Sequence, residues 1–364
     1  MKATNGASTR EADVFARIEA FRRRTPRLKD ERITLAHGAG GKASASLLEA
    51  IFLPAFGLDT TEGLADAAVL APMPGERLAF TTDAYVVKPL RFPGGSVGDL
   101  AVNGTINDLA MVGACPVGIT AAFVLEEGLS VETLRDVVAD MAAAATRAGV
   151  PIVAGDTKVV DRGAADGLFV TTAGVGSIPS GRRLSAASVR PGDVVIVSGP
   201  IADHGMAVLL ARGDLALDAD IRSDSAPLHG LVEALLAAAP GTRWLRDATR
   251  GGVGTVCNEL ARDADVTVVL EEAALPVRPE VAGACELLGI DPLYVANEGR
   301  LVAVVPPEEE TVALAAMRAH PFGGGAVRIG ELRDEPRGIV VLITPFGGTR
   351  IVDMLVGDPL PRIC

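Results

Sequence analysis

Short apolar runs of strand type alternate with helical patterns along most of the chain, and this alternation narrows the possible folds more than any other feature. Between residues 33 and 178 the strand-like runs are DAAVLA, RLAFTTD, PVGITAAFVL, PIVAGD and GLFVTTAGVGSI, and helical periodicity covers 44–56, 97–112 and 131–148. A stretch rich in Ser, Arg, Gly and Pro at 179–191 precedes a fresh strand, DVVIVSGP. The pattern predicts a first α/β domain over 33–180.

A second α/β domain is predicted over 190–343. Its expected strands lie near 194–198, 266–270, 300–305 and 327–332, and its expected helices cover 205–212, 227–239, 252–262 and 308–320. The remaining residues, 344–364, are broken by Gly and Pro and predict an irregular, flexible tail. Residues 1–32 form an N-terminal extension with an amphipathic, Arg-rich stretch, for which a short surface helix is favoured over a binding arm.

The charge balance excludes some partners. The net charge is −12, whereas nucleic acids and anionic membranes are bound through clustered Lys and Arg, so neither is an expected partner. The four cysteines are scattered and suit a reducing compartment. Neither a secretory signal nor an apolar run of about 20 residues is present, which together predicts a cytoplasmic protein.

Four aspartates stand at the edges of strand or helix runs in the first domain. They are Asp66, Asp83, Asp108 and Asp156. Magnesium bound to a nucleotide is commonly held by one or two carboxylates together with phosphate oxygens. The group therefore predicts a magnesium and phosphate pocket, although any single member could instead serve a turn or a helix cap.

Two further segments could contact phosphate. Lys158 follows Asp156 closely and offers a point charge, or it is simply a solvated strand lysine. The glycine-rich segment HGAGGK at 37–42 offers backbone N–H groups ahead of a helix, but it lacks the residues of a Walker A loop and could be only a flexible loop.

Other polar motifs stay open at this level. Asn103 and Asn107 share one helix face and need partners if they are buried. RDATRGGV at 246–253 suits either an anion-binding helix entry or a structural turn. The pairs and triplets Glu271-Glu272, Asn297-Glu298-Gly299 and Asp203-His204-Gly205 add charge without being diagnostic.

Taken in order, the motifs resemble the HypE family of hydrogenase maturation proteins. They are HGAGGK, DAAVL, TTDAYVVKP, FPGGSVGDLAVNGTINDLAMVGACP, VLEEG, AGDTKVV, DATRGGV, VANEGR and the terminal PRIC. The family belongs to the superfamily of aminoimidazole ribonucleotide synthetase, selenophosphate synthetase and thiamine-monophosphate kinase. The resemblance covers nearly everything from residue 33 to 364, and PRIC is the motif that separates this family from its relatives.

The resemblance implies a two-domain fold like that of aminoimidazole ribonucleotide synthetase, with a homodimer formed through strands of the N-terminal domain. ATP would lie between the glycine-rich segment and the acidic group. Magnesium and phosphate would be held by Asp66, Asp83, Asp108 and Asp156. ATP would also be contacted by Asn107 and Lys158, and by a phosphate lid made of His37, Gly38, Gly40, Gly41 and Lys42.

The resemblance also implies chemistry at the last residue. Cys364 would receive a carbamoyl group from the carbamoyltransferase HypF, and the resulting carboxamide would be dehydrated to a thiocyanate with ATP. Cyanide would then pass to iron on the HypC–HypD complex. Lys158 would assist catalysis, and because the amide nitrogen must lose protons, Glu271 or Glu272 is the candidate base.

Two rival functions predict different behaviour. Another ATP enzyme of the superfamily, acting on a free small molecule, would keep its turnover without Cys364. An ATP-sensing scaffold that uses its tail as a docking peptide would show no covalent change at Cys364.

Overall fold

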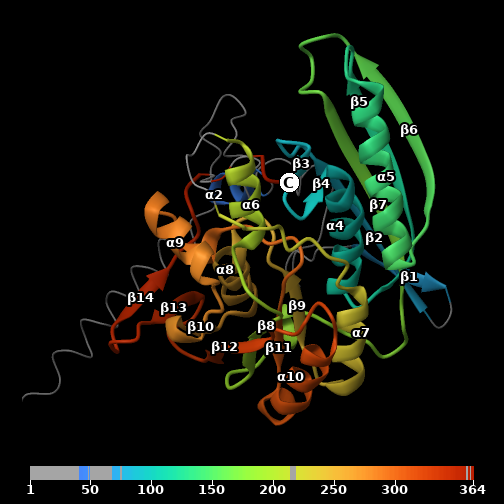
Figure 1. The fold of residues 1–364 in the computed structure, drawn as a ribbon. Coiled ribbons are helices and arrows are strands. Elements are labelled where there is room, and N and C mark those ends of the chain that lie inside the picture. The colour runs from blue at the N-terminus through green and yellow to red at the C-terminus, as the bar shows by residue number, and fades with distance from the viewer. Residues whose placement is uncertain are drawn as a thin grey trace, which may run out of the picture.

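The computed structural model describes residues 41–47, 49, 68–73, 76–213, 219–357, 360 and 362–364. The chain forms one domain around a five-stranded sheet and another around a seven-stranded sheet (Figure 1). This arrangement confirms the two-domain α/β fold expected from the sequence. No helix within the described ranges is long and apolar enough to cross a membrane.

The first domain is built on a sheet with the strand order β1-β2-β7-β5-β6. Its strands are β1 (Ala68–Met73), β2 (Glu76–Tyr85), β5 (Cys115–Glu126), β6 (Ile152–Val160) and β7 (Leu168–Ile178). Only β5 and β6 run parallel, and α5 (Val131–Ala148) connects them. The short α2 (Lys42–Leu47) precedes the sheet, and a small hairpin of β3 (Arg91–Phe92) and β4 (Gly95–Ser96) precedes α4 (Val97–Met111).

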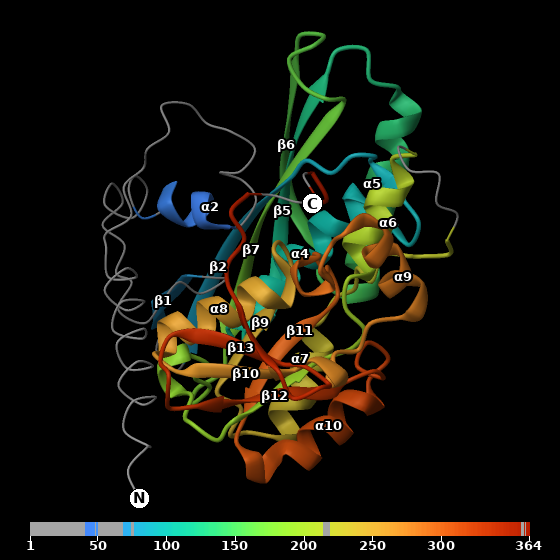
Figure 2. The same ribbon diagram turned by 90° about the vertical axis from the view of Figure 1, so that its left-hand side faces the viewer.

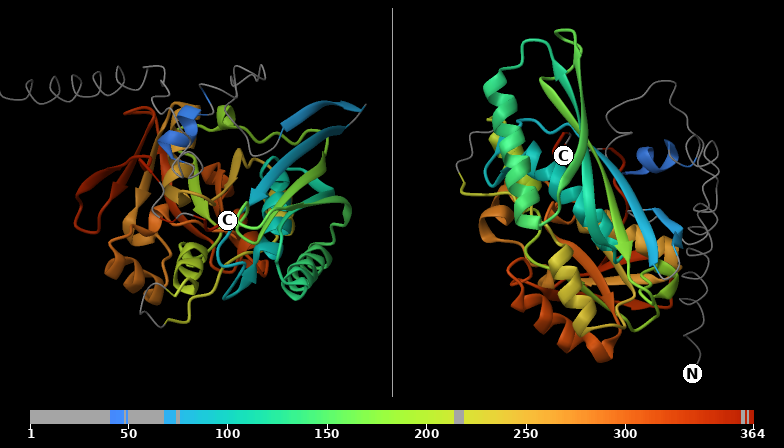
Figure 3. Two further views of the ribbon diagram at one scale, coloured as in Figure 1. Left: turned by 90° about the horizontal axis from the view of Figure 1, so that it is seen from above. Right: turned by 90° about the vertical axis from the view of Figure 1, so that its right-hand side faces the viewer.

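Helix α4 is the central element of the molecule. Together with α5 it lies on one face of the first sheet, as Figures 1 and 3 show, and it also contacts β9 and α7 of the second domain. Every residue of α4 is buried except Asp99 and Asp108. Such all-round burial is typical of a helix enclosed between two layers, and it makes α4 the structural link between the domains.

The second domain is built on a sheet with the order β14-β13-β10-β12-β8-β11-β9. Its strands are β8 (Val194–Val197), β9 (Trp244–Asp247), β10 (Thr267–Glu271), β11 (Leu301–Val305), β12 (Val327–Arg333), β13 (Ile339–Ile343) and β14 (Thr349–Val352). Its α-helices are α6 (Asp203–Ala211), α7 (His229–Ala238), α8 (Gly252–Ala264), α9 (Pro279–Leu288) and α10 (Glu310–Ala319). Short 3-10 segments are η3 (Ala186–Ser188), η4 (Glu272–Ala274), η5 (Pro292–Tyr294) and η6 (Pro307–Glu309).

Both faces of the second sheet are covered, which explains its continuous apolar strands. In β8, Val195 and Val197 belong to the core that includes α8, whereas Val194 and Ile196 belong to the core that includes α7 and α10. The strands expected at 194–198, 266–270, 300–305 and 327–332 are all present, whereas β9, α9, β13 and β14 were not predicted.

The tail differs from the expectation. The prediction of irregular structure from residue 344 is wrong over Thr349–Val352, because these residues form β14 and pair antiparallel with β13. The final residues then return to the first domain, and the C-terminus lies between the two domains in Figures 2 and 3. Leu360 and Ile363 are buried in the same core as Tyr85 and Val87. The end of the chain is therefore docked in this structure.

Candidate active site at the domain junction

Strand β2 and helix α4 bring two of the predicted aspartates together. Alternate residues of β2 face α4, and the hydroxyl of Thr105 on α4 donates to Asp83 Oδ2 over 2.9 Å. The hydroxyl of Thr81 on β2 donates in the opposite direction, to Asp108 Oδ2, over 2.6 Å. This crossed pair of hydrogen bonds places both carboxylates on the same side of the sheet.

Tyr85, two residues after Asp83, lies against the same helix. A Cβ added to Gly104 would come within 2.2 Å of the Tyr85 hydroxyl oxygen, so only glycine permits this approach. The pKa of Tyr85 is raised well above its ordinary value, first by burial and then by the nearby charges of Asp83, Glu298 and Asp108. The phenol therefore stays a neutral hydrogen-bonding group in an acidic site.

The second domain supplies a further buried carboxyl group, Glu298. Only 3% of this residue is exposed. Its pKa is raised well above the usual range, first by burial and then by Asp247, Asp224 and Asp83, while Arg250 acts in the opposite direction. The carboxylates of both domains thus face one another across the junction.

The C-terminus enters this junction beside β2. The backbone N–H of Val86 donates to Cys364 O over 3.1 Å, and the N–H of Lys88 donates to Arg362 O over 3.1 Å. Because the two sequences run in opposite directions, the last three residues extend the edge of β2 like an antiparallel strand. Cys364 is thereby held level with Val86, about 10 Å along the strand from Asp83.

Asp156 and Lys158 lie elsewhere. Asp83 pairs with Thr172 on β7, Thr172 with Ala121 on β5, and Ala121 with Gly155 on β6. Three strand spacings therefore separate Asp83 from the neighbour of Asp156, a distance of about 14 Å, and Asp156 itself points to the opposite face. Lys158 Nζ is 3.6 Å from Asp156 Oδ2, with the two side chains 74% and 67% exposed.

The comparisons with known proteins agree with this architecture. Residues 64–178 match the model of the AIR synthase related protein N-terminal domain, and residues 190–343 match that of the C-terminal domain. The carbamoyl dehydratase HypE of Rhodobacter capsulatus is 58% identical over 340 residues, which is 93% of this chain and 99% of the relative. The chain belongs to the HypE family of carbamoyl dehydratases.

Solved HypE structures carry the same fold. A HypE–HypF complex matches with a TM-score of 0.80 and 46% identity, over 85% of this chain and 99% of that one. The hydrogenase maturation protein HypE in complex with ATP matches with a TM-score of 0.77 and 44% identity, over 92% of this chain and 100% of that one.

The residues expected from the HypE family differ in where this structure places them. Asp83, Asp108 and Cys364 are placed at the junction. Asp156 and Lys158 are not brought to it within one chain. His37, Gly38, Gly40 and Asp66 lie outside the described residues. Among the residues described, no three His, Cys, Asp or Glu side chains form a group that could hold a metal ion by themselves.

The end of the glycine-rich segment lies against the tail. The backbone N–H of Lys42 donates to Leu355 O over 3.2 Å, and its ammonium is 2.9 Å from Asp353 Oδ2. A Cβ added to Gly41 would stand 2.6 Å from Leu355 O, so this contact requires glycine. The end of the segment predicted to bind phosphate and the chain that leads to Cys364 are therefore neighbours.

Asn107, predicted to contact ATP, makes hydrogen bonds to the second domain. Its amide nitrogen donates to Ala226 O and Glu298 O, and its oxygen accepts from the N–H of Leu228. All of these partners belong to the second domain. The buried amide thus joins the domains and fixes the backbone of Glu298, with both of its N–H groups engaged in the second domain.

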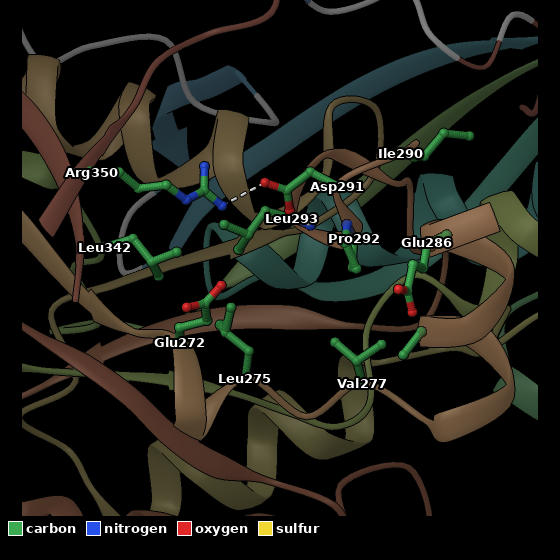
Figure 4. Close-up of a pocket in the computed structure, with 12 residues that line it drawn as sticks. Glu272, Leu275, Val277, Glu286, Ile290, Asp291, Pro292, Leu293, Leu342 and Arg350 are labelled. Carbon is green, nitrogen blue, oxygen red and sulfur yellow. Dashed lines mark hydrogen bonds and ion pairs between the residues drawn. The ribbon is translucent and has the colours of Figure 1, made fainter. Parts of the chain in front are cut away.

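Glu271 and Glu272 stand away from the buried carboxylates, at the exposed end of β10. Glu272 lines a cavity of about 360 Å³ together with Asp291 and Arg350, whose side chains are 2.6 Å apart (Figure 4). Sequence reasoning ranked this pair above Glu298, since two adjacent acidic residues after a strand are easier to notice than one Glu in the turn VANEGR.

Proposed function

We propose that this protein is an ATP-dependent carbamoyl dehydratase that acts on its own C-terminal cysteine and supplies the cyanide ligands of nickel–iron hydrogenases. One observation carries the proposal: the chain ends at the junction where Asp83, Asp108 and Glu298 converge. Membership of the HypE family gives the reaction, and the docked terminus gives its substrate, the S-carboxamide of Cys364.

The reaction balances as a dehydration coupled to ATP cleavage. An amide oxygen is a poor leaving group until phosphorylation converts it into an iminophosphate. Departure of inorganic phosphate then removes that oxygen and leaves the C≡N bond, while the amide nitrogen loses both protons and ATP becomes ADP. Charge on the transferred phosphoryl group must be stabilised by fixed charges at the site.

Asp83 and Asp108 fit a magnesium site. They are two oxygen donors on one side of the sheet, the number that usually holds magnesium when nucleotide phosphates complete its shell. When bound, the ion would neutralise phosphate charge. Crossed hydrogen bonds from Thr81 and Thr105 orient the carboxylates of Asp108 and Asp83, so both side chains are held in place before a metal binds.

Glu298 is the better candidate base. Burial and neighbouring carboxylates raise its pKa, which makes its carboxylate a stronger proton acceptor than an exposed glutamate. Asn107 donates to the backbone carbonyl of Glu298, and the charge of Asp83 is one of those that raise the pKa of Glu298. Glu271 and Glu272, by contrast, are exposed.

A homodimer would form through the uncovered part of the first sheet. Strand β6 is an edge strand, and exposed apolar side chains gather on β2, β5 and β6, namely Phe80, Val117, Ile152, Val153 and Val159. Edges of this length with exposed Val and Ile are normally paired or covered. A second chain there would also cover Asp156 and Lys158, where Lys158 could assist a shared site.

Partners follow from the family. A HypE–HypF complex is known for a relative, so the carbamoyltransferase HypF is the proposed donor. The HypC–HypD complex is the proposed acceptor of cyanide, and the net charge of −12 argues against nucleic acid as a partner. The proposed place of action is the cytoplasm.

The test is the mass of the C-terminal peptide ending in PRIC. After incubation with HypF, carbamoyl phosphate and Mg-ATP, we expect a gain of one carbamoyl group followed by loss of one water, and neither change in Cys364→Ala. Cys115→Ala is the matched control, because Cys115 is also a free cysteine and is exposed. An unmodified peptide beside an active HypF would instead favour an ATP enzyme acting on a free substrate.

A further inference from the structure

His204, on α6, holds the backbone of the penultimate residue. It is fully buried, and its Nε2 lies 2.7 Å from Ile363 O. A carbonyl can only accept, so Nε2 carries the hydrogen, and Nδ1 accepts from the Ser223 hydroxyl over 2.8 Å. Burial lowers the pKa of His204, which agrees with this neutral tautomer. The ring of Phe92 packs against it edge-on, with the ring centroids 5.5 Å apart.

Arg212, the residue that ends α6, holds the preceding carbonyl. Its guanidinium donates to Arg362 O over 2.9 Å and to Lys88 O over 3.0 Å. It therefore ties the tail and the first domain to the second domain at one point.

Asp166, in the loop before β7, holds the side chain of Arg362. The two form an ion pair, and Arg362 Nε also donates to Val86 O over 3.2 Å. The Arg362 backbone has a φ of +59°, a conformation that disfavours residues other than glycine. Contacts from both domains therefore maintain a turn that this residue would not prefer alone.

These contacts hold the carbonyl groups of all three final residues, while the Ile363 side chain fills the core. Backbone contacts do not depend on what the sulfur of Cys364 carries. The same grip would thus accept the thiol, the carboxamide and the thiocyanate.

We propose that His204, Arg212 and Asp166 form a latch that positions the C-terminal tripeptide for dehydration and opens when Cys364 visits a partner. His204 is the main positioning residue, because departure of the tail leaves its buried N–H without an acceptor, which disfavours the open state. The reaction step rests on the proposed function, but docking of the tail does not.

The direct test is alkylation of the folded full-length protein by iodoacetamide, followed by mass spectrometry. Exposed Cys115 serves as the internal reference, and the unfolded chain gives the intrinsic reactivity of each cysteine. We expect His204→Ala to raise the Cys364 to Cys115 labelling ratio by about tenfold or more, because the variant leaves the Ile363 carbonyl without its buried donor. His204→Gln keeps an N–H donor and should stay within about threefold of the wild type.

Two variants keep the result decisive. His320→Gln alters a histidine that takes no part in the latch and should leave the ratio unchanged. Asp166→Asn removes the ion pair at a half-exposed position and should raise the ratio about threefold, so it decides the question if His204→Ala does not fold. Wild-type ratios in both His204→Ala and Asp166→Asn would overturn the latch.

The reaction gives a second, separable result. With HypF, carbamoyl phosphate and Mg-ATP, His204→Ala should be carbamoylated at least as fast as the wild type but should form thiocyanate about tenfold more slowly. Failure of the wild type to form thiocyanate would count against the proposed function, while the labelling ratio would still judge the latch. Normal dehydration in a variant whose tail is released would show that the latch does not position the cysteine.

Discussion

The C-terminal tripeptide carries Cys364 and strand β6 carries Asp156 and Lys158, two parts of the expected site. The two segments differ in how far the rest of the chain buries and contacts them. The tripeptide is irregular in sequence, yet both domains hold it, and Ile363 is buried. Strand β6 is regular, yet nearly every residue is exposed, Asp156 and Lys158 included. Regular secondary structure therefore does not indicate which part of the expected site is held by contacts within one chain.

The difference shows which interactions one chain can complete. At the junction, Asp83, Asp108, Glu298 and the backbone of Cys364 find partners in the same chain. On β6 the described partners of Asp156 are its own neighbours, Lys158 and the N–H of Thr157, and the apolar side chains beside them face solvent. We infer that a single chain positions the catalytic groups at the junction, and that a second chain is needed to cover β6.

The largest expected effect comes from Glu298→Gln. This change keeps the shape but removes the proposed base, so thiocyanate formation should fall by about 10²–10⁴-fold, the range for general bases. Carbamoylation of Cys364 by HypF should persist, because it needs no proton from this carboxyl group. The measurement is single-turnover mass spectrometry of the terminal peptide.

Glu272→Gln is the matched control. It makes the same chemical change at the exposed end of β10, in the pocket of Figure 4, and should leave the rate within about twofold. A large loss of rate in Glu272→Gln with a normal rate in Glu298→Gln would contradict Glu298 as the base. It would favour the pair predicted from the sequence, Glu271 and Glu272.

A smaller effect is expected from Val153→Asp on β6. Val153 is 65% exposed, so the monomer should tolerate the change, whereas a dimer interface would have to desolvate the new charge. We expect sedimentation to show monomers and dehydration to fall by roughly tenfold. Val312→Asp, at an exposed apolar position on α10, should change neither.

Much of the fold could be predicted because the signals are local. Helix α5 begins at Val131 and ends at Ala148 as the periodicity predicts, with Ser130 accepting from the N–H of Glu132 and Gly149 in the left-handed conformation. The five strand runs of the first domain were found for the same reason, since their apolar alternation depends only on neighbouring residues.

The rest depends on contacts distant in sequence. Nothing near the tail shows that His204 donates a hydrogen bond to a carbonyl 159 positions away. Asp83 and Asp156 look equivalent in sequence, but the strand order β2-β7-β5-β6 separates them. The burial of Glu298 does not follow from the local turn VANEGR, and its carbonyl accepts from Asn107, 191 positions earlier.

The smallest expected effect concerns stability below the docked tail, at Asp203. This carboxylate starts α6, is fully buried and lies 3.1 Å from the Arg278 guanidinium. Burial raises its pKa from 3.8 to about 6, more than Arg278 lowers it. The folded protein therefore binds a proton more readily than the unfolded chain, and the free energy of unfolding decreases as pH rises from about 4 to 6.

Asp203→Asn should remove this dependence. At pH 8 we expect the variant to be more stable than the wild type by on the order of 2 kcal/mol, and the advantage should disappear at about pH 3, which is below the pKa of Asp203 in both states. Urea unfolding at both pH values measures it. Asp156→Asn makes the same change on exposed β6 and should shift stability by less than about 0.5 kcal/mol at either pH. Equal responses of the two variants would mean that the docked region does not bury its charges more deeply than β6 does.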